Sequence, residues 1–326
     1  MFSQYKKIRK YVDLAGKILL ISHRSPDADT LGAALALRKV LLSKGKGVEV
    51  ACIDKPRKTY SFLENVSEFV LDFNIEDYDL VIVLDAGASY MTDFHLRYPN
   101  LFDGSVPIIN IDHHASNDNF GTVNVVDPKA ASTTYILYKM FLDWGVEIDE
   151  EIATALLSGI YGDTGSFMHA NTSGDVLQVA ADLMAYGAQI AEITKALFNT
   201  TDIKTLKLWG KVLEKSSVTD DDVVMSVIRD SEYAEYDAAP NNLSGVIDYL
   251  NMVPETKFAV LLHEDRQGNV KGSFRTRVDD IDLSRIAAVF GGGGHPKASG
   301  FSIRGKLKQE LKYSIISDED KKTLDF

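Results

Sequence analysis

The sequence of 326 residues contains a single cysteine, Cys52, so no disulfide can form within the chain. A chain with so little cysteine fits a reducing compartment, and we expect a cytoplasmic protein. The sequence also lacks any apolar run of the roughly 18 residues that a membrane span requires. Its first residues, MFSQYKKIRKYVDLAGK, are charged and contain no apolar stretch typical of a secretion signal. These absences argue against a disulfide scaffold and against an integral membrane protein.

Basic charge is scarce as well, because 35 Lys and Arg residues stand against 47 Asp and Glu, a formal net charge of −12. This argues against a protein that coats long nucleic acids, since such binding depends on many Lys and Arg contacts to phosphates. It does not argue against a small anionic substrate, because bound divalent cations can make an acidic protein locally positive. Two nucleotide-binding signatures are also missing. GxxxxGK[ST] does not occur, and Pro296 prevents the glycine run before it from fitting GxGxxG.

Short apolar runs alternate with helical stretches in the first half of the chain. Runs rich in Val, Ile and Leu are typical of parallel strands buried on both faces, and they occupy residues 17–22, 48–53, 79–85 and 106–112. One helical stretch lies between the first two runs, with Gly45 as its stop, and further ones fill about 131–215. This alternation predicts an α/β fold, with a doubly wound domain whose mainly parallel sheet is flanked by helices.

The pattern changes after about residue 216. Segments 222–228, 256–264 and 269–278 resemble strands, and a short helix then leads into GGGGHPKASG. We therefore expect a second, smaller α/β domain joined to the first by a helical linker. The predicted organisation is a first domain at 1–188, a linker at 189–215, a second domain at 216–306 and a charged C-terminal tail at 307–326.

Carboxylates and imidazoles follow the apolar runs of the first domain, where the carboxyl ends of parallel strands form a common edge. They are His23, Asp27, Asp29, Asp85, Asp112, His113 and His114, with Asp163 in GDTGSF after a helical stretch. Several carboxylates close together repel one another, and two divalent cations would offset their charge. Carboxylate and imidazole ligands without thiolate suit Mn²⁺, Mg²⁺ or Zn²⁺. In two-metal sites such ions stabilise the oxygens of an in-line displacement at phosphorus.

Taken singly, these residues have simpler interpretations: a helix N-cap for Asp29, turn residues for Asp85 and Asp163, and solvated loop residues for His113 and His114. The joint pattern favours a metal site, because three of the seven histidines stand at strand ends beside acids. The histidines that fit no such pattern are expected to be structural or surface residues: His95, His169 and His263.

A second cluster lies in GSFRTR and FGGGGHPKASG. Glycines let backbone N–H groups approach an anion closely, and Arg275 could hold a phosphate with two hydrogen bonds. His295, Lys297 and Ser299 add further donors. The alternative interpretation of the glycine run is a flexible hinge.

These segments together resemble a known family. HRSPDADT, VLDAG, IDHH and GDTGSF resemble the four ordered motifs of the DHH phosphoesterases, and SFRTR followed by FGGGGHPKASG resembles the DHHA1 domain that accompanies them. The resemblance runs from about residue 4 to about residue 305 and is to the stand-alone bacterial and archaeal branch. Members of that branch degrade very short RNAs (nanoRNA) and dephosphorylate 3′-phosphoadenosine 5′-phosphate (PAP), and some cleave linear dinucleotides.

The resemblance implies a role for each motif residue. One Mn²⁺ would be held by His23, Asp27 and Asp85, and a second by Asp29, Asp85, His113 and Asp163, with Asp85 as the bridge and Mg²⁺ or Co²⁺ as alternative ions. His114 would contact the scissile phosphate and protonate the leaving group, and Asp112 would orient a histidine. Substrate-binding positions in the second domain would be Arg275, Gly292, Gly293, Gly294, His295 and Ser299.

We therefore expect a manganese-dependent phosphoesterase that hydrolyses very short oligoribonucleotides or linear dinucleotides to mononucleotides, and also PAP to AMP. A water between the ions would lose a proton and attack phosphorus in line, and a cleft between the domains would limit substrate length. A homodimer is expected from the resemblance alone. Where related nanoRNases often carry a basic residue such as Arg, this chain has Met168 and His169, which bears on substrate preference rather than on the metal chemistry.

Two alternatives remain at this point. One is a dedicated PAP phosphatase with little activity on RNA. The other, of a different class, is a catalytically silent nucleotide-binding sensor, against which the complete set of ligand residues argues. An inorganic pyrophosphatase is less favoured, because the glycine-rich second domain resembles the type that handles nucleotides.

Overall fold

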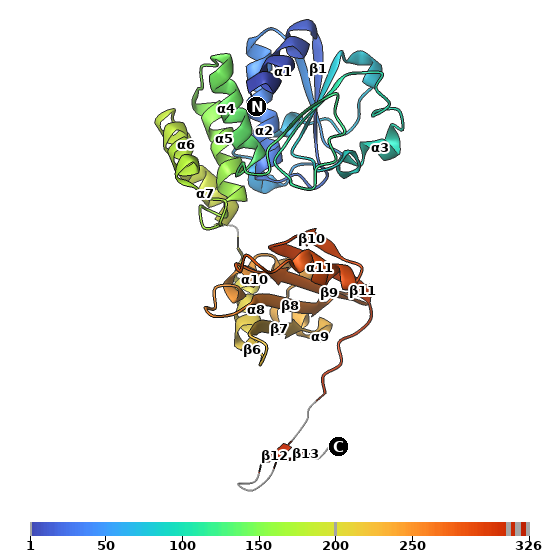
Figure 1. Ribbon diagram of the computed structural model, residues 1–326, viewed down its shortest axis with the longest axis vertical. Coiled ribbons are helices and arrows are strands. Elements are labelled where there is room, and N and C mark those ends of the chain that lie inside the picture. Colours follow the sequence, from blue (N-terminus) through green and yellow to red (C-terminus); the bar gives the residue numbers. More distant parts are fainter. Residues whose placement is uncertain (1, 199–200, 311–313, 317–320, 324–326) are drawn as a thin grey trace. The chain divides into compact units, whose positions relative to one another are not determined.

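The computed structural model describes residues 2–198, 201–310, 314–316 and 321–323. The chain divides into two compact units, Met1–Thr200 and Thr201–Phe326 (Figure 1). Parts of the predicted C-terminal tail, 307–326, lie outside the described residues.

The two helices of the predicted linker, 189–215, pack into different units. Helix α7 (Ile190–Phe198) contributes Ile193 to the core of the first unit, whereas α8 (Ile203–Glu214) contributes Leu208 and Val212 to the core of the second. Each helix has an apolar stripe, and burying that stripe against the nearest sheet domain favours this division over a free-standing connector.

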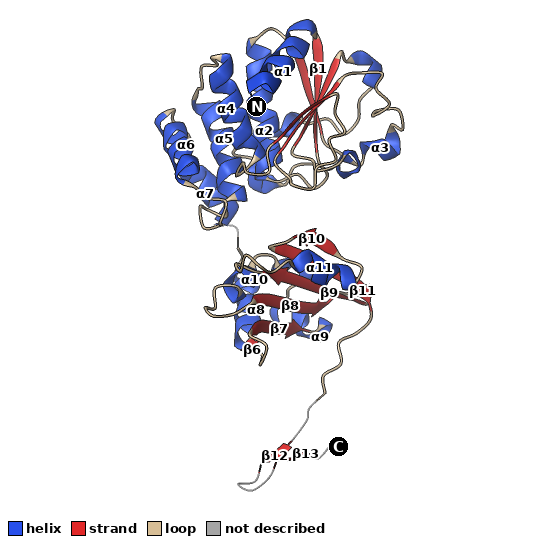
Figure 2. Cartoon of the chain, viewed as in Figure 1, coloured by secondary structure: helices blue, strands red, loops and turns tan. Residues whose placement is uncertain are grey.

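A five-stranded parallel sheet forms the centre of the first unit (Figure 2). Its order is β2-β1-β3-β4-β5, with β1 at Lys17–Ser22, β2 at Gly47–Ala51, β3 at Leu80–Leu84, β4 at Ile108–Asp112 and β5 at Val123–Val126. Ile18 and Leu20 of β1 enter one hydrophobic core, and Leu19 and Ile21 enter another on the opposite face. The α/β fold expected from the apolar runs is therefore confirmed, although β5 was not predicted.

The strand order reverses between β1 and β3. The chain leaves β1 towards β2 on one side, and β3, β4 and β5 follow on the other side of β1. In open α/β sheets such a switch point leaves a crevice beyond the carboxyl ends of the two central strands. The loops after β1 and β3 are therefore where the fold can place a ligand.

Helices cover one face of this sheet closely. The helices against the strands are α1 (Phe2–Leu14), α2 (Ala28–Ser43) and α4 (Thr133–Trp144). Behind them, α5 (Glu150–Asp163) packs on α2 and α4, and α6 (Gly174–Ala185) packs on α4 and α5, while the short α3 (Phe94–Arg97) lies against the other core. Helices α2 and α5 touch at Gly32, where an added Cβ would lie only 2.2 Å from the carbonyl oxygen of Ala155. Gly45 follows α2 with a φ of 74°, as expected of a helix stop.

The second unit contains a six-stranded sheet in the order β10-β11-β9-β8-β7-β6. The strands are β6 (Ser217–Val218), β7 (Val223–Ile228), β8 (Phe258–Glu264), β9 (Asn269–Arg275), β10 (Gly293–His295) and β11 (Ala298–Arg304). Its helices are α8, α9 (Asp230–Tyr233), α10 (Val246–Leu250) and α11 (Leu283–Val289). The second, smaller α/β domain is thus confirmed as well.

Short elements complete the described chain. The 3₁₀ turns lie at Lys58–Tyr60, Val66–Glu68, Ile75–Asp77, Ser89–Thr92, Ala234–Tyr236 and Pro240–Leu243. Strands β12 (Ser314–Ile316) and β13 (Lys321–Thr323) pair antiparallel. Within the residues described, no helix has the length and apolar character needed to cross a membrane.

Candidate metal and phosphoester site

Side chains from four separate segments meet at the carboxyl edge of the first sheet. Three groups have ligand atoms that all lie within 4.8 Å of one another: His23, Asp27 and Asp85; Asp29, His113 and Asp163; and Asp85, His113 and His114. Three of these segments lie at the carboxyl ends of β1, β3 and β4, and the fourth is the C-terminal end of α5. Every residue proposed as a metal ligand from the sequence is therefore present in at least one of these groups.

Asp85 belongs to the first group and also contacts the second through His113. It follows β3 directly with a φ of 59°, a left-handed conformation that Asp tolerates better than most residues, and only 2% of it is exposed. Its Oδ2 lies 3.5 Å from Nε2 of His23, and its Oδ1 lies 3.5 Å from Nε2 of His113. The two oxygens of one carboxylate thus face different histidines, as a ligand shared by two ions requires.

Asp27, rather than Asp29, caps helix α2. Its Oδ1 accepts hydrogen bonds from the backbone nitrogens of Asp29 and Thr30, at 3.0 and 3.1 Å. Its Oδ2 is directed elsewhere and lies 3.9 Å from Nε2 of His23. Because the helix begins at Ala28, the simpler interpretation of Asp29 as the cap is wrong, and the Asp29 carboxylate is available for another role.

Asp29 is 1% exposed and is held by the first turn of α4. Its Oδ2 accepts a hydrogen bond from the backbone nitrogen of Thr133 at 2.6 Å, and its Oδ1 accepts from the nitrogen and the hydroxyl of Thr134 at 2.9 and 2.6 Å. Gly159 of α5 leaves the space for this carboxylate, since a Cβ there would lie 2.4 Å from Oδ1. The positive end of α4 therefore stabilises a buried negative charge.

Asp163 is the last residue of α5, and its side chain reaches the site from the end of that helix. Its Oδ2 lies 3.1 Å from Nε2 of His113. Behind it, residues 165–167 all have positive φ angles, and the chain turns sharply. The backbone oxygen of Asp163 lies 3.2 Å from Nδ1 of His169 and accepts a hydrogen bond from the Asn171 side chain. His169 thus supports the backbone of this turn, which fits the structural role expected of it.

The carboxylates shift one another's protonation. Burial and the neighbouring Asp29 raise the pKa of Asp85 well above its usual range. Burial and Asp29 likewise raise the pKa of Asp163 to about 7. Burial alone would lower the pKa of His113, but its hydrogen bond to Asp163 and the charges of Asp29 and Asp85 raise it to about 10. Without cations, the cluster therefore retains protons that free carboxylic acids would release at neutral pH.

This donor set fits divalent cations. The four carboxylates Asp27, Asp29, Asp85 and Asp163 and the imidazoles His23 and His113 offer oxygen and nitrogen ligands without thiolate. Two divalent ions would offset four negative charges, which here are offset only in part by protons. The ligating groups are also held from behind by hydrogen bonds, as is usual at metal sites.

His114 differs from its neighbour because a different carboxylate, that of Asp112, orients it. Its Nδ1 lies 2.7 Å from Oδ1 of Asp112, which is fully buried at the end of β4. Asp112 also accepts a hydrogen bond at Oδ2 from the side chain of Asn117, at 2.6 Å. Burial would raise the pKa of Asp112, but these hydrogen bonds hold it below the usual value. The His114 side chain is 40% exposed, and its Nε2 makes no hydrogen bond to a described residue.

In the second unit, the residues predicted to bind substrate lie at the β9-β11-β10 edge of the sheet. Arg275 and His295 are both paired with Ala298, from opposite sides, so they share one sheet face. Arg275 contacts Asp248 at 3.3 Å through Nε. Nδ1 of His295 accepts a hydrogen bond from the nitrogen of Lys297, which leaves its Nε2–H as a donor.

Ser299 and two of the glycines have internal contacts of their own. Ser299 is buried, stands in register with Gly294 on the opposite face, and donates its hydroxyl hydrogen bond to the backbone oxygen of His295 at 2.8 Å. A Cβ at Gly292 or Gly294 would lie 2.1 or 2.6 Å from a backbone oxygen of β11. The glycine run therefore permits the close approach of two strands, which is a different reason for glycine from a flexible hinge.

Residues 17–160 match the model of the N-terminal domain of the DHH family, and residues 220–317 match that of the DHHA1 domain. The chain belongs to the DHH family. It is 34% identical over 295 residues to the bifunctional oligoribonuclease and PAP phosphatase NrnA of Thermus thermophilus, covering 89% of this chain and 85% of that protein. It is 27% identical over 296 residues to the protein of the same name from Bacillus subtilis, covering 90% and 91%. The family resemblance expected from the motifs is confirmed.

Solved structures show the same fold. An exopolyphosphatase-related protein from Bacteroides fragilis superimposes with a TM-score of 0.86 at 24% identity, over 94% of this chain and 93% of that one. RecJ of Thermus thermophilus, in complex with Mn²⁺, gives a TM-score of 0.52 at 14% identity and covers 93% of this chain and 52% of RecJ. The fold of this chain is therefore shared with these proteins.

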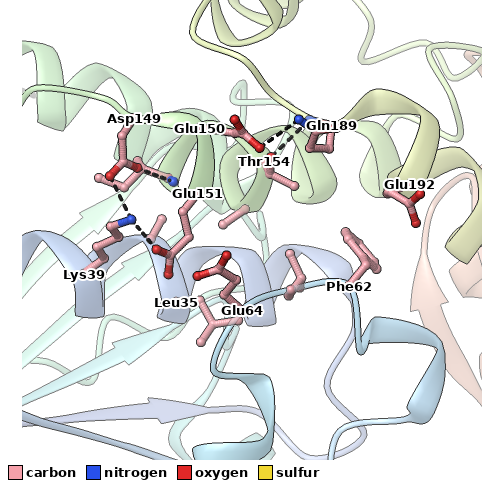
Figure 3. A pocket seen from close by; sticks show the side chains of 14 residues that line it. Leu35, Lys39, Phe62, Glu64, Asp149, Glu150, Glu151, Thr154, Gln189 and Glu192 are labelled. Atoms are coloured by element: carbon pink, nitrogen blue, oxygen red, sulfur yellow. Dashed lines mark hydrogen bonds and ion pairs between the residues drawn. The ribbon is translucent and has the colours of Figure 1, made fainter.

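A separate pocket of about 290 Å³ occurs in the DHH domain (Figure 3). It lies between α2, the segment 62–64, the start of α5 and α7, and Lys39 there binds Asp149 and Glu151. Lys39 and Asp29 are ten residues apart on α2, which at 1.5 Å per residue separates them by about 15 Å. None of the predicted site residues lines this pocket, so it is not part of the candidate metal site.

Thr133, Thr134 and Asn117 support the site of this DHH protein but were not predicted from the sequence. The first two belong to ASTTYIL, where three hydroxyl residues before an apolar run indicate only a helix start. Asn117 follows IDHH by three residues in a loop. Its polar side chain next to the motif is the one signal that could have identified it.

Proposed function

We propose that this DHH protein is a metal-dependent phosphoesterase that hydrolyses very short oligoribonucleotides or linear dinucleotides to mononucleotides, and PAP to AMP. The observation that carries the proposal is the pair of ligand groups on either side of Asp85, with its two oxygens facing His23 and His113. The two activities are those in the names of the Thermus thermophilus and Bacillus subtilis relatives, which align with most of this chain. A cytoplasmic location and a homodimer stay predictions.

Two cations, with Mn²⁺ as the first choice and Mg²⁺ or Co²⁺ as alternatives, would be held by the two ligand groups. One would bind His23, Asp27 and Asp85, and the other Asp29, His113 and Asp163 together with Asp85. When bound, such ions lower the pKa of water and offset the negative charge of phosphate oxygens during in-line displacement. The raised pKa values of Asp85 and Asp163 support this assignment, because both reflect burial of the carboxylates together with the negative charge of Asp29 beside them.

His114 would supply the proton that the departing oxygen needs. Asp112 accepts the hydrogen bond of Nδ1 and orients the ring, so that Nε2–H can donate to the leaving group. The neighbouring His113 is unsuited to this role, because its Nε2 lies against Asp163 and Asp85. The two adjacent histidines would therefore have different functions, set by different carboxylates.

In the DHHA1 domain, Arg275 and His295 would bind the part of the substrate that does not react. Their shared sheet face supports a joint contact with one anionic group. Strand β10 is an edge strand, so part of its backbone is unpaired and available to a phosphate oxygen. Because few phosphates are contacted, the acidic net charge of the protein does not oppose binding.

The experiment that tests the function is a product time course on a ladder of 5′-labelled RNAs from the dinucleotide upward, beside PAP, with and without Mn²⁺. The proposal predicts metal-dependent cleavage of the shortest RNAs and release of AMP from PAP. Cleavage of PAP alone would indicate a dedicated phosphatase. No metal-dependent turnover of any of these substrates, or of bis-p-nitrophenyl phosphate, would indicate a binding protein instead.

A further inference from the structure

Helix α4 begins at the candidate metal site, and its first residue contacts carboxylates of both ligand groups. The backbone nitrogen of Thr133 donates to Oδ2 of Asp29 at 2.6 Å, and its hydroxyl donates to Oδ1 of Asp85 at 3.1 Å. We propose that Thr133 is a positioning residue that fixes the separation of the two ligand groups and thereby the affinity for the second cation. The inference rests on the proposed function of this site.

The hydrogen bonds at the start of α4 show how this residue is itself held. The nitrogens of Thr133 and Thr134 both donate to Asp29, and the nitrogen of Tyr135 donates to the hydroxyl of Ser132, the N-cap. The nitrogen of Ile136 then makes the first bond within the helix, to the backbone oxygen of Ser132. The N–H groups of the first three helical residues, which a helix leaves without a partner of its own, are thus all directed to defined acceptors. Thr133 is fully buried and fixed on both sides.

The hydroxyl of Thr133 has a specific task at Asp85. Three histidines, His23, His113 and His114, lie near the Asp85 carboxylate. Among the residues that the structure describes, the Thr133 hydroxyl is the one other side-chain donor to it. The histidines are candidate metal ligands or substrate contacts, so none of them can hold Asp85 independently of what is bound. Loss of the hydroxyl would leave the carboxylate free to rotate about its terminal torsion, which has broad minima.

One residue therefore links two carboxylates that repel each other. Its two donors belong to one residue, so the geometry of Thr133 constrains the distance between Asp29 and Asp85. Asp29 belongs to one ligand group and Asp85 is shared, which makes the spacing of the cations depend on this link. Removing a hydrogen bond behind a metal ligand typically weakens metal binding by about 10–100-fold.

The test uses the full chain and two variants of this residue. Thr133→Val keeps the shape and the backbone N–H but removes the hydroxyl, and Thr133→Ser keeps the hydroxyl. Metal-free protein is titrated with Mn²⁺ by calorimetry, and paramagnetic resonance spectra report whether two ions lie close enough to couple. We expect two ions and a coupled spectrum for the native protein. For Thr133→Val we expect about 10–100-fold weaker binding of the second ion and no coupled spectrum at stoichiometric metal. Thr133→Ser should restore both.

Thr154→Val provides the matched control. Thr154 is also buried in the DHH domain, and its hydroxyl accepts a hydrogen bond from the nitrogen of Gln189, away from the ligands. This variant should bind both ions as the native protein does. Should Thr133→Val not fold, Thr133→Ala removes the same hydroxyl without a second buried methyl group and carries the same expectation.

The outcomes separate this inference from the proposed function. Native binding of both ions by a folded Thr133→Val protein, or failure of Thr133→Ser to restore the coupled spectrum, would overturn the role of Thr133 and leave the two-cation site intact. A native protein that binds fewer than two ions would overturn the site itself, and the role of Thr133 with it.

Discussion

Nδ1 of His114 lies 2.7 Å from Oδ1 of Asp112, whereas Nε2 of the adjacent His113 lies 3.1 Å from Oδ2 of Asp163. Two neighbouring imidazoles are thus turned in different directions by different carboxylates. One is directed into the ligand cluster, and the other presents a nitrogen that no described residue contacts through a hydrogen bond. This division suggests separate tests for metal binding and for proton donation.

His114→Ala should lower kcat on a dinucleotide by about 10²–10⁴-fold, the range typical of lost general acid catalysis. The loss should be much smaller on bis-p-nitrophenyl phosphate, because p-nitrophenolate departs without a proton. Steady-state kinetics on both substrates at saturating Mn²⁺ measure the difference. An equal loss on both, accompanied by weaker Mn²⁺ binding, would make His114 a metal ligand instead of a proton donor.

Asp85→Asn should abolish tight binding of both cations and almost all turnover. The amide keeps the size of the side chain but removes the charge that both ligand groups share, so we expect a loss beyond the roughly 10–100-fold typical of outer residues. Metal content after dialysis and turnover on a dinucleotide measure the effect. Asp182→Asn is the control for net charge, since Asp182 accepts hydrogen bonds from Tyr138 and Gln178 elsewhere in the domain. Near-native turnover by Asp85→Asn would refute the shared ligand.

Metal should stabilise the protein more at high pH than at low pH. In the metal-free fold the pKa of Asp163 is raised to about 7, so the proton it retains stabilises the fold at low pH, and this contribution is lost as pH rises from about 4 to 7. The pKa of His113 is raised to about 10, and its contribution is likewise complete below about 6.5 and lost towards pH 10. Both protons compete with cations.

The measurement is the shift in Tm on adding Mn²⁺ to chelator-treated protein, at about pH 5.5 and about pH 8. We expect a clearly larger shift at the higher pH, because fewer protons must then be displaced. The control is the Tm of the metal-free protein, which should be lower at about pH 8 than at about pH 5.5. A shift that is the same at both would mean that these groups do not hold the metal.

Arg275→Ala should raise KM for a dinucleotide by about 10–100-fold, as expected for loss of a hydrogen bond to a charged group. KM for bis-p-nitrophenyl phosphate should change little, because that substrate has no second phosphate for the DHHA1 domain. Asp248→Asn is a matched control: it removes the carboxylate 3.3 Å from Arg275 but leaves the guanidinium free for substrate. Equal changes for both substrates would exclude Arg275 from substrate binding.

Gly32→Ala should destabilise the DHH domain by about 1–3 kcal/mol, the range for overpacking a close contact. The reason is the 2.2 Å that an added Cβ would leave to the oxygen of Ala155. Gly210→Ala in α8 is the opposite case, because nothing lies within 4 Å of its Cβ position, and it should stabilise by about 0.5–1 kcal/mol. Denaturant unfolding measures both. Equal, stabilising effects would mean that α2 and α5 are not packed this closely.

The sequence predicted the strands that are buried on both faces better than the others. Strands β1 and β3 coincide with apolar runs, and β4 with a run that Asn110 alone interrupts before the final Asp112, because each face of the sheet meets a hydrophobic core. Strand β5 has only four residues, and Asn124 interrupts its apolar pattern. Strand β10 consists of residues that favour loops, and it forms because glycine allows it to lie against β11.

Apart from Asp163, which ends α5, the candidate ligands could be predicted because they follow parallel strands, whose carboxyl ends lie along one edge of the sheet. Thr133 could not, since its hydroxyl bonds to a residue 48 positions away and its local sequence indicates only a helix start. Ser299 was predicted to bind substrate from its place in the motif. In the structure it is buried and donates a hydrogen bond to the backbone oxygen of His295, and both features depend on strand pairing that the sequence does not specify. Residue type and position after a strand carry information about ligands, whereas the contacts that orient them are tertiary.

A crystal structure of the full chain with Mn²⁺, located by anomalous scattering, tests the shared role of Asp85 most directly. We predict two Mn²⁺ ions about 3.5–4 Å apart, with Oδ2 of Asp85 on the ion near His23 and Oδ1 on the ion near His113. A single ion, or two ions of which only one contacts Asp85, would contradict the account.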